Sequence, residues 1–116
     1  MNIVIIPARK SSKRIKNKNI INFFGKPIIA HTIKFLNNMN IFDKIIVLSD
    51  SKKILNIARK YGAETMTRNK KLAYDKVPTF NVIKNVLENL DYKVDYVCVV
   101  NPTSVFIKKK YIYESF

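Results

Sequence analysis

The residues best suited to chemistry lie close together near the start of the chain, between positions 8 and 19. The cations of this segment are Arg9, Lys10, Lys13, Arg14, Lys16 and Lys18, and no acidic residue precedes Asp43. The residues between them are small or polar: Ala8, Ser11, Ser12, Asn17 and Asn19. Cations neutralise phosphate, and small residues let backbone N–H groups approach it. The segment predicts an anion-binding loop, although a solvated basic loop would have the same cation content.

The stretch before this loop has the sequence of a buried strand. Ile3, Val4, Ile5 and Ile6 are consecutive apolar β-formers, and the run ends at Pro7. A strand covered on both faces of a parallel sheet has this pattern. Open α/β sheets bind ligands at the carboxyl ends of their strands, which is where the cationic loop begins. This position favours the anion-binding interpretation over the solvated loop.

The rest of the chain alternates predicted strands with predicted helices, which is typical of a parallel sheet with helices on its faces. Pro27 is expected at the first position of a helix that ends near Asn37. The other expected helices are Lys52–Tyr61, Thr79–Leu90 and a helix that begins at Lys108 and is still running at Phe116. The expected strands are Lys44–Leu48 and Tyr96–Val100, both buried, and Glu64–Thr67 at an edge.

Polar residues follow the two later buried strands, as they follow the first. Ser49, Asp50 and Ser51 come after Lys44–Leu48, and Asn101–Ser104 come after Tyr96–Val100. These strand ends should lie at one edge of the sheet and form one crevice. Asp50 is the one acid expected at that edge. Capping of the helix that starts at Lys52, by Asp50 or by Ser51, is the favoured role of these residues, and we predict that Asp50 is the cap.

Two single residues suggest reactive chemistry, and each has a simpler structural interpretation. His31 lies in the predicted helix after Pro27 with no other metal-binding residue near it in sequence, so we expect a packed or half-exposed side chain. Cys98 is the one cysteine of the chain and lies within an apolar run. We expect it to be a buried small hydrophobe, and one cysteine cannot form an intramolecular disulfide.

Composition limits the class of protein. The formal net charge is +14, which is compatible with nucleic-acid binding. However, Lys, Asn and Ile dominate the composition, all three have A/T-rich codons, and the cations are spread along the chain without a recognition motif. We therefore expect no specific nucleic-acid partner. No apolar run approaches the roughly 20 residues of a membrane span, and no signal peptide is evident, so we expect a cytoplasmic protein.

The opening segment resembles the cytidylyltransferases that activate nonulosonic acids. Their signature has PAR, then small residues, a KR or KG pair and a KN pair; here these are Pro7-Ala8-Arg9, Ser11-Ser12-Lys13-Arg14 and Lys18-Asn19. Ser11 stands where glycine is common. Residues 42–64, FDKIIVLSDSKKILNIARKYGAE, are also similar to the family. The segment around Thr79 and the NPT that starts at Asn101 are most similar to pseudaminic acid cytidylyltransferases, with the N-acetylneuraminate and legionaminate enzymes next.

The resemblance implies an α/β protein with a three-layer Rossmann-like nucleotidyltransferase fold, a mostly parallel sheet, and transfer of the cytidylyl group from CTP to a nonulosonic acid with release of pyrophosphate. It assigns catalytic roles to Arg9 and Lys18. It assigns nucleotide binding to Ala8, Ser11, Ser12, Lys13, Asn19, Asp75 and Thr79. It assigns binding of the acceptor sugar to Arg68, Asn101, Thr103 and Ser104. For Asp75 and Thr79 a turn residue and a helix cap are equally good interpretations.

The resemblance covers residues 1–116 as one domain, which is about the N-terminal half of the family's usual length. The family's Mg²⁺ is held by aspartates of the other half, which also carries a dimerisation segment. We therefore expect no metal ligands in this chain, a homodimer only for the complete enzyme, and a chain that binds CTP without turning it over. Another sugar nucleotidyltransferase and a noncatalytic basic module that binds polyanions remain as alternatives.

Overall fold

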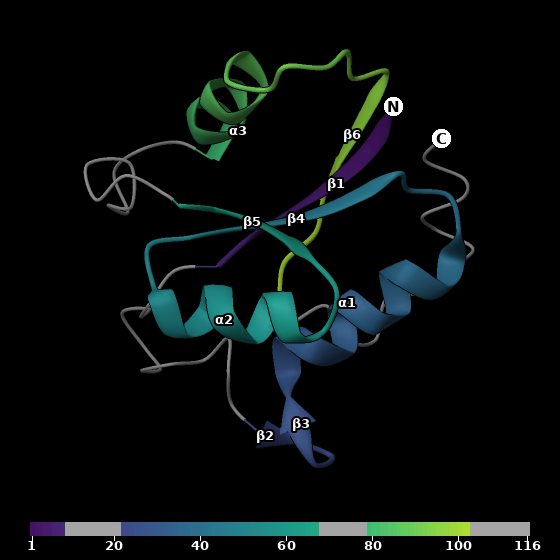
Figure 1. Ribbon diagram of the computed structural model, residues 1–116, viewed down its shortest axis with the longest axis vertical. Coiled ribbons are helices and arrows are strands. Elements are labelled where there is room, and N and C mark those ends of the chain that lie inside the picture. The colour runs from purple at the N-terminus through teal and green to yellow at the C-terminus, as the bar shows by residue number, and fades with distance from the viewer. Residues whose placement is uncertain (9–21, 68–78, 103–116) are drawn as a thin grey trace.

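The part of the chain that the structure describes is built on a four-stranded parallel sheet (Figure 1). The computed structural model describes residues 1–8, 22–67 and 79–102, without the side chains of residues 79–82 and 85. The strands are β1 (Asn2–Pro7), β4 (Lys44–Ser49), β5 (Glu64–Thr67) and β6 (Tyr96–Val99), in the spatial order β5-β4-β1-β6. Each neighbouring pair is parallel. The expected parallel α/β fold is confirmed, with β5 at an edge.

The first strand is buried on both faces because helices cover both faces of the sheet. Ile3, Val4, Ile5 and Ile6 are all fully buried. Val4 and Ile6 belong to one core cluster, while Ile3 and Ile5 belong to another. Alternate residues of a strand point to opposite faces, so the uninterrupted apolar run supplies both cores, as the sequence predicts.

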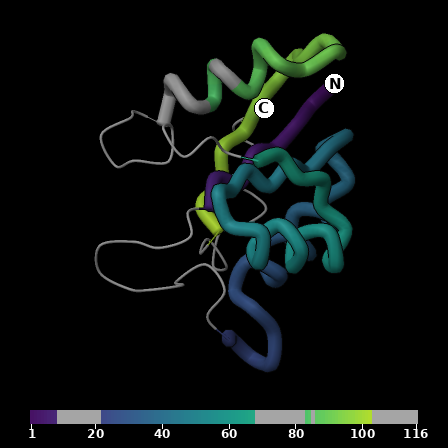
Figure 2. Tube along the Cα trace, turned by 60° about the vertical axis from the view of Figure 1, so that its left-hand side comes forward, coloured from purple at the N-terminus to yellow at the C-terminus, as the bar shows by residue number. Residues whose placement is uncertain are grey.

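Within the described ranges, three helices form the two outer layers. Helices α1 (Ile28–Met39) and α2 (Lys52–Lys60) pack on the face that holds Val4 and Ile6, and α3 (Thr79–Glu88) packs on the other. Figures 1 and 2 show α3 on the opposite side of the sheet from α1 and α2. The expected three-layer arrangement is confirmed. No helix in the described ranges is long and apolar enough to cross a membrane.

A small hairpin, which the sequence pattern does not predict, precedes α1. Its strands are β2 (Asn22–Phe23) and β3 (Lys26–Pro27), joined by Phe24 and Gly25 at φ 50° and 83°. Positive φ at both central residues is the geometry of a tight hairpin turn. Pro27 is therefore the N-cap of α1 rather than its first residue. The ring of His31 hydrogen-bonds the Phe23 carbonyl through Nε2, which confirms the packed role of His31.

The prediction of burial for the last strand is wrong. Tyr96, Val97 and Val99 are 57%, 38% and 44% exposed, and burial begins only at Val100. The cause is position, because β6 pairs with β1 alone and lies at the edge of the described sheet. Cys98 is likewise only half-buried, and this partial burial raises the pKa of its thiol.

Candidate functional site

The carboxyl ends of the four strands meet at one edge of the sheet, as the sequence predicts. The register pairs Pro7 with Leu48, and Ser49 with Thr67. Two backbone bonds extend the pairing past the strands. The Ala8 N–H donates to the Leu48 carbonyl at 2.8 Å, and the Val100 N–H donates to the Ile5 carbonyl at 3.1 Å. This edge is the candidate site.

The order of the strands predicts where a ligand crevice lies within this edge. From β1 the chain moves outward through β4 to β5, and then returns to place β6 on the other side of β1. In open α/β sheets the ligand crevice lies where successive connections leave in opposite directions. Here that point is between the carboxyl ends of β1 and β6. The cationic segment follows Ala8 on one side of this point, and Asn101 follows β6 on the other.

Buried hydroxyl groups hold the strand ends in place. Among the described residues, the buried polar side chains are Thr32, Ser49 and Ser51, and each bonds to a backbone group at this edge. The Ser49 Oγ accepts from the Ser51 N–H at 3.1 Å, and the Ser51 Oγ accepts from the Ile54 N–H at 3.3 Å. Ser51 is therefore the N-cap of α2, and the assignment of the cap to Asp50 is wrong. Ser51, rather than Asp50, precedes the first helical residue directly, which explains the difference.

Most of the predicted site residues lie outside the described residues, so their mutual geometry stays a prediction. They are Arg9, Ser11, Ser12, Lys13, Lys18, Asn19, Arg68, Asp75, Thr103 and Ser104. The backbone of Thr79 begins α3 as predicted, while its side chain is not described. Ala8 and Asn101 are described, and they lie at the ends of the two strands that flank the crevice.

Ala8 and Asn101 differ in what they can contribute. Ala8 is fully buried and its N–H is already bonded to the sheet, so any role in nucleotide binding depends on its position and small size. Asn101 is exposed, whereas the next residue, Pro102, is buried. The amide side chain of Asn101 is therefore available to a ligand.

The described part of the edge does not form a metal site. Asp50 is its one described carboxylate, because Asp43, Glu64 and Asp95 lie at the amino ends of β4, β5 and β6. No three His, Cys, Asp or Glu side chains come together within residues 1–8, 22–67 and 79–102. Since Mg²⁺ sites use carboxylates together with substrate phosphates, these residues do not supply a complete ligand set.

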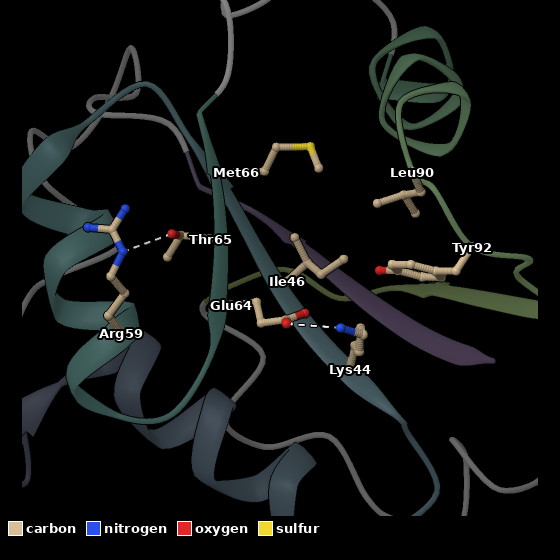
Figure 3. Close-up of a pocket in the computed structure, with 8 residues that line it drawn as sticks. All are labelled: Lys44, Ile46, Arg59, Glu64, Thr65, Met66, Leu90 and Tyr92. Carbon is tan, nitrogen blue, oxygen red and sulfur yellow. Dashed lines mark hydrogen bonds and ion pairs between the residues drawn. The ribbon is translucent and has the colours of Figure 1, made fainter.

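A cavity of about 410 Å³ lies toward the opposite edge of the sheet, where β4 and β5 begin (Figure 3). Lys44 and Glu64, the first residues of β4 and β5, lie beside it together with Tyr92 from the segment after α3. Its other lining residues are Ile46, Arg59, Thr65, Met66 and Leu90. No motif in the sequence marks this cavity, because its lining comes from four separate parts of the chain: β4, α2, β5 and the segment after α3.

Two charged side chains of this cavity, Lys44 and Glu64, are paired with each other. The Lys44 Nζ lies 3.0 Å from Glu64 Oε1 and 5.1 Å from the centre of the Tyr92 ring. Glu64 raises the pKa of Lys44, and burial raises the pKa of Tyr92. Both shifts favour the protonated form at neutral pH, so neither group is prepared to act as a base. The carboxyl edge is the better candidate for chemistry.

Comparison with known proteins gives a consistent result. A family model described as "Cytidylyltransferase" matches residues 3–116. The chain is 40% identical over 122 residues to the pseudaminic acid cytidylyltransferase of Campylobacter jejuni, covering 99% of this chain and 53% of the relative. It is 39% identical over 114 residues to the N-acylneuraminate cytidylyltransferase of Escherichia coli, covering 97% of this chain and 27% of the relative.

Solved structures show the same fold at low sequence identity. A CMP:2-keto-3-deoxy-manno-octonic acid synthetase in complex with CTP matches with a TM-score of 0.83 and 17% identity, over 97% of this chain and 44% of its own. A cytidylyltransferase from Leptospira borgpetersenii matches with a TM-score of 0.79 and 19% identity, over 99% of this chain and 48% of its own. The chain thus spans about half the length of several of the proteins it matches.

Proposed function

Because this chain belongs to the cytidylyltransferase family, we propose that it forms the CTP-binding half of an enzyme that transfers a cytidylyl group to a nonulosonic acid. The resemblance seen in Pro7-Ala8-Arg9 and Lys18-Asn19 is thereby confirmed at the level of the family. The observation that carries the proposal is the switch in strand order between β1 and β6, because the cationic segment follows directly from the carboxyl end of β1.

The proposed roles on the β1 side concern the nucleotide. Arg9, Lys13 and Lys18 neutralise the triphosphate, Ser11 and Ser12 donate from backbone or hydroxyl groups, and Asn19 contacts the nucleotide. Asp75 and Thr79 belong to the segment that closes over it. Negative charge grows on the phosphoryl oxygens during transfer, and positioned cations stabilise that charge more than they stabilise the ground state.

The proposed roles on the β6 side concern the acceptor sugar. Asn101, Thr103 and Ser104 face the sugar, and Arg68 meets its carboxylate or the ribose. The anomeric oxygen attacks the α-phosphorus, a new oxygen–phosphorus bond forms, and the bond to the β-phosphate breaks to release pyrophosphate. Holding the two substrates on facing sides of one crevice is the main contribution expected from the protein.

Pseudaminic acid is the proposed acceptor. The support is the identity of 40% to the Campylobacter jejuni protein, against 36% over 114 residues to the CMP-N,N'-diacetyllegionaminic acid synthase of Legionella pneumophila. Because these identities differ little, the assay must include legionaminic and N-acetylneuraminic acids. Mg²⁺ is the proposed cofactor of a protein of family length. It would supply charge neutralisation at the phosphates, with ligands that the described residues do not provide.

Nucleotide binding is tested by titration calorimetry of the chain with CTP and with ATP at two salt concentrations. We expect CTP to bind more tightly and to keep that preference in moderate salt. Arg9→Ala and Lys18→Ala should each weaken CTP binding by about 1.5–3 kcal/mol, the range for hydrogen bonds to charged groups. Lys84→Ala, an exposed lysine on α3, is the matched control and should leave the preference intact.

The competing function is nonspecific binding of polyanions, which the net charge of +14 favours. It predicts equal binding of CTP and ATP, lost in moderate salt, with the three lysine and arginine variants equally affected. Circular dichroism must show that every variant remains folded. Pyrophosphate release from CTP and each acid then compares the chain with a version extended to family length. Turnover by the short form at the rate of the long form would contradict the division into halves.

A further inference from the structure

Thr32 is the polar residue on the otherwise apolar buried face of α1. It is fully buried, and so are Ile29 and Ile33 on either side of it. A hydroxyl group that is shielded from water needs a hydrogen-bond partner inside the protein. The Thr32 Oγ1 donates to the carbonyl oxygen of Pro102 at 2.7 Å. The bond joins residues that are 70 positions apart in the sequence.

This bond differs from the usual behaviour of threonine within a helix. A helical threonine commonly bonds the carbonyl four residues earlier, which here belongs to Ile28. Instead, the hydroxyl reaches out of α1 to the turn that follows β6. Pro102 has no N–H group, so its carbonyl is its one backbone hydrogen-bonding group. The Thr32 hydroxyl therefore holds the one backbone group of Pro102 that can form a hydrogen bond, its carbonyl oxygen.

The anchored turn lies on the β6 side of the crevice. The Val100 N–H bonds the Ile5 carbonyl, and the next anchor is the bond from Thr32 to Pro102. Asn101 lies between these two anchors and is exposed. The backbone of Asn101 is thus held from both sides, and its amide side chain is left for a ligand.

We propose that Thr32 is a positioning residue that fixes the Asn101–Pro102 turn so that Asn101 is oriented toward the acceptor sugar. The inference rests on the proposed function, since that function gives Asn101 its partner. Thr32 itself touches no substrate in this arrangement. Its effect passes through the backbone of the turn.

Hydrogen exchange tests the anchoring without any assay of activity. Thr32→Val replaces the hydroxyl with a methyl group of similar size, and Thr32→Ser keeps the hydroxyl. We expect Thr32→Val to speed exchange of the Val100 amide about fivefold or more, as loss of one hydrogen bond implies. The Ala8 amide is the internal control, because it bonds to Leu48 on the other side of β1. It should exchange at the wild-type rate in both variants.

Kinetics then test the link to the acceptor, in a version of the protein extended to the length of its relatives. Thr32→Val should raise KM for pseudaminic acid about tenfold, or for whichever panel acid the wild type uses, and should leave KM for CTP within about twofold. Thr32→Ser should restore most of the acceptor KM. A role in packing alone would instead change both KM values, or neither, and would not distinguish serine from valine.

Several results would overturn the inference. They are equal exchange of Val100 in all variants, equal acceleration of Val100 and Ala8, and Thr32→Ser behaving like Thr32→Val. If Thr32→Val does not fold, Thr32→Ala is compared with Thr32→Ser instead. Both lack the threonine methyl group, and only Thr32→Ala also lacks the hydroxyl, so the same criteria apply. Absence of pyrophosphate release by the wild type with every acid would refute the proposed function, while the exchange result would still decide the anchoring.

Discussion

Removal of the cap at Ser51 is the perturbation whose magnitude the structure defines best. Ser51→Ala deletes one hydrogen bond, from the Ile54 N–H at 3.3 Å, and leaves the bond from the Ser51 N–H to Ser49 in place. Loss of an N-cap costs about 0.5–2 kcal/mol. Ser51 is 9% and Ile54 1% exposed, so water replaces the lost acceptor poorly. We therefore expect Ser51→Ala to lower the free energy of unfolding by about 1.5 kcal/mol, toward the upper part of that range.

The expected shift in melting temperature follows from chain length. An unfolding entropy of about 2.1 cal/mol/K per residue gives about 0.24 kcal/mol/K for 116 residues. A loss of about 1.5 kcal/mol then lowers Tm by about 6 °C. Urea denaturation followed by circular dichroism measures the free energy of unfolding, and a thermal scan measures Tm.

Two matched variants separate capping from other effects of the substitution. Ser51→Asn keeps a side-chain acceptor and should stay within about 0.5 kcal/mol of wild type. Lys53→Ala removes an exposed cation from the first turn of α2, where the helix dipole disfavours cations, and should stabilise by a few tenths of a kcal/mol. A Ser51→Ala protein as stable as wild type, or as stable as Ser51→Asn, would refute the assignment of the cap.

Three further outcomes are expected. Partial burial raises the pKa of the Cys98 thiol, so the folded state holds this proton more tightly, and the stability that this contributes is lost as pH rises through the raised pKa. Alkylation of Cys98 at about pH 8 should therefore be slower than alkylation of glutathione, and equal rates would contradict the prediction. Gly62→Ala should lower the free energy of unfolding, measured by urea denaturation, by about 1 kcal/mol, because the φ of Gly62 is +93°. Gly62→Asn should lower it less, because asparagine tolerates positive φ better. Steric overlap adds little in either variant, since a Cβ would lie 3.6 Å from Asn37 Nδ2. The exposed side chains of Val97 and Val99, on a strand at the edge of the described sheet, should favour self-association of the chain. The double variant Val97→Thr/Val99→Thr should therefore reduce self-association in sedimentation without lowering Tm.

The sequence was sufficient to predict which strands are buried and how they pair wherever these follow from the apolar runs and from the alternation of strands with helices. The apolar run of β1 is buried on both faces, and the strand–helix alternation gives parallel pairing, as expected. The pattern was insufficient for β6, whose residues Tyr96–Val99 have the composition of a buried strand but lie at an edge. Composition reports what a strand can bury, whereas exposure depends on which strand lies beside it.

The hairpin before α1 was missed for a related reason. Phe24-Gly25 is not a common turn pair, because phenylalanine rarely adopts positive φ. Its φ of 50° is held in a hairpin whose Phe23 carbonyl bonds the His31 ring. The conformational preference of Phe24 therefore disfavours this turn, whereas the contact between the hairpin and His31 of α1 is visible only in the folded structure. The prediction of the α2 cap was wrong by one position, since both Asp50 and Ser51 are good capping residues.

The buried hydroxyl groups show how the candidate site is connected to the core. Apolar pattern specifies the strands and the faces of the helices, and any β-branched residue could fill the position of Thr32 between Ile29 and Ile33. A hydroxyl at a core position would be destabilising without its partner, so it marks a place where the core holds a particular backbone group. Thr32, Ser49 and Ser51 all hold such groups at the carboxyl edge. A polar residue within an apolar helical face is thus a sequence signal for the site edge, but its partner Pro102 becomes identifiable only in the folded structure.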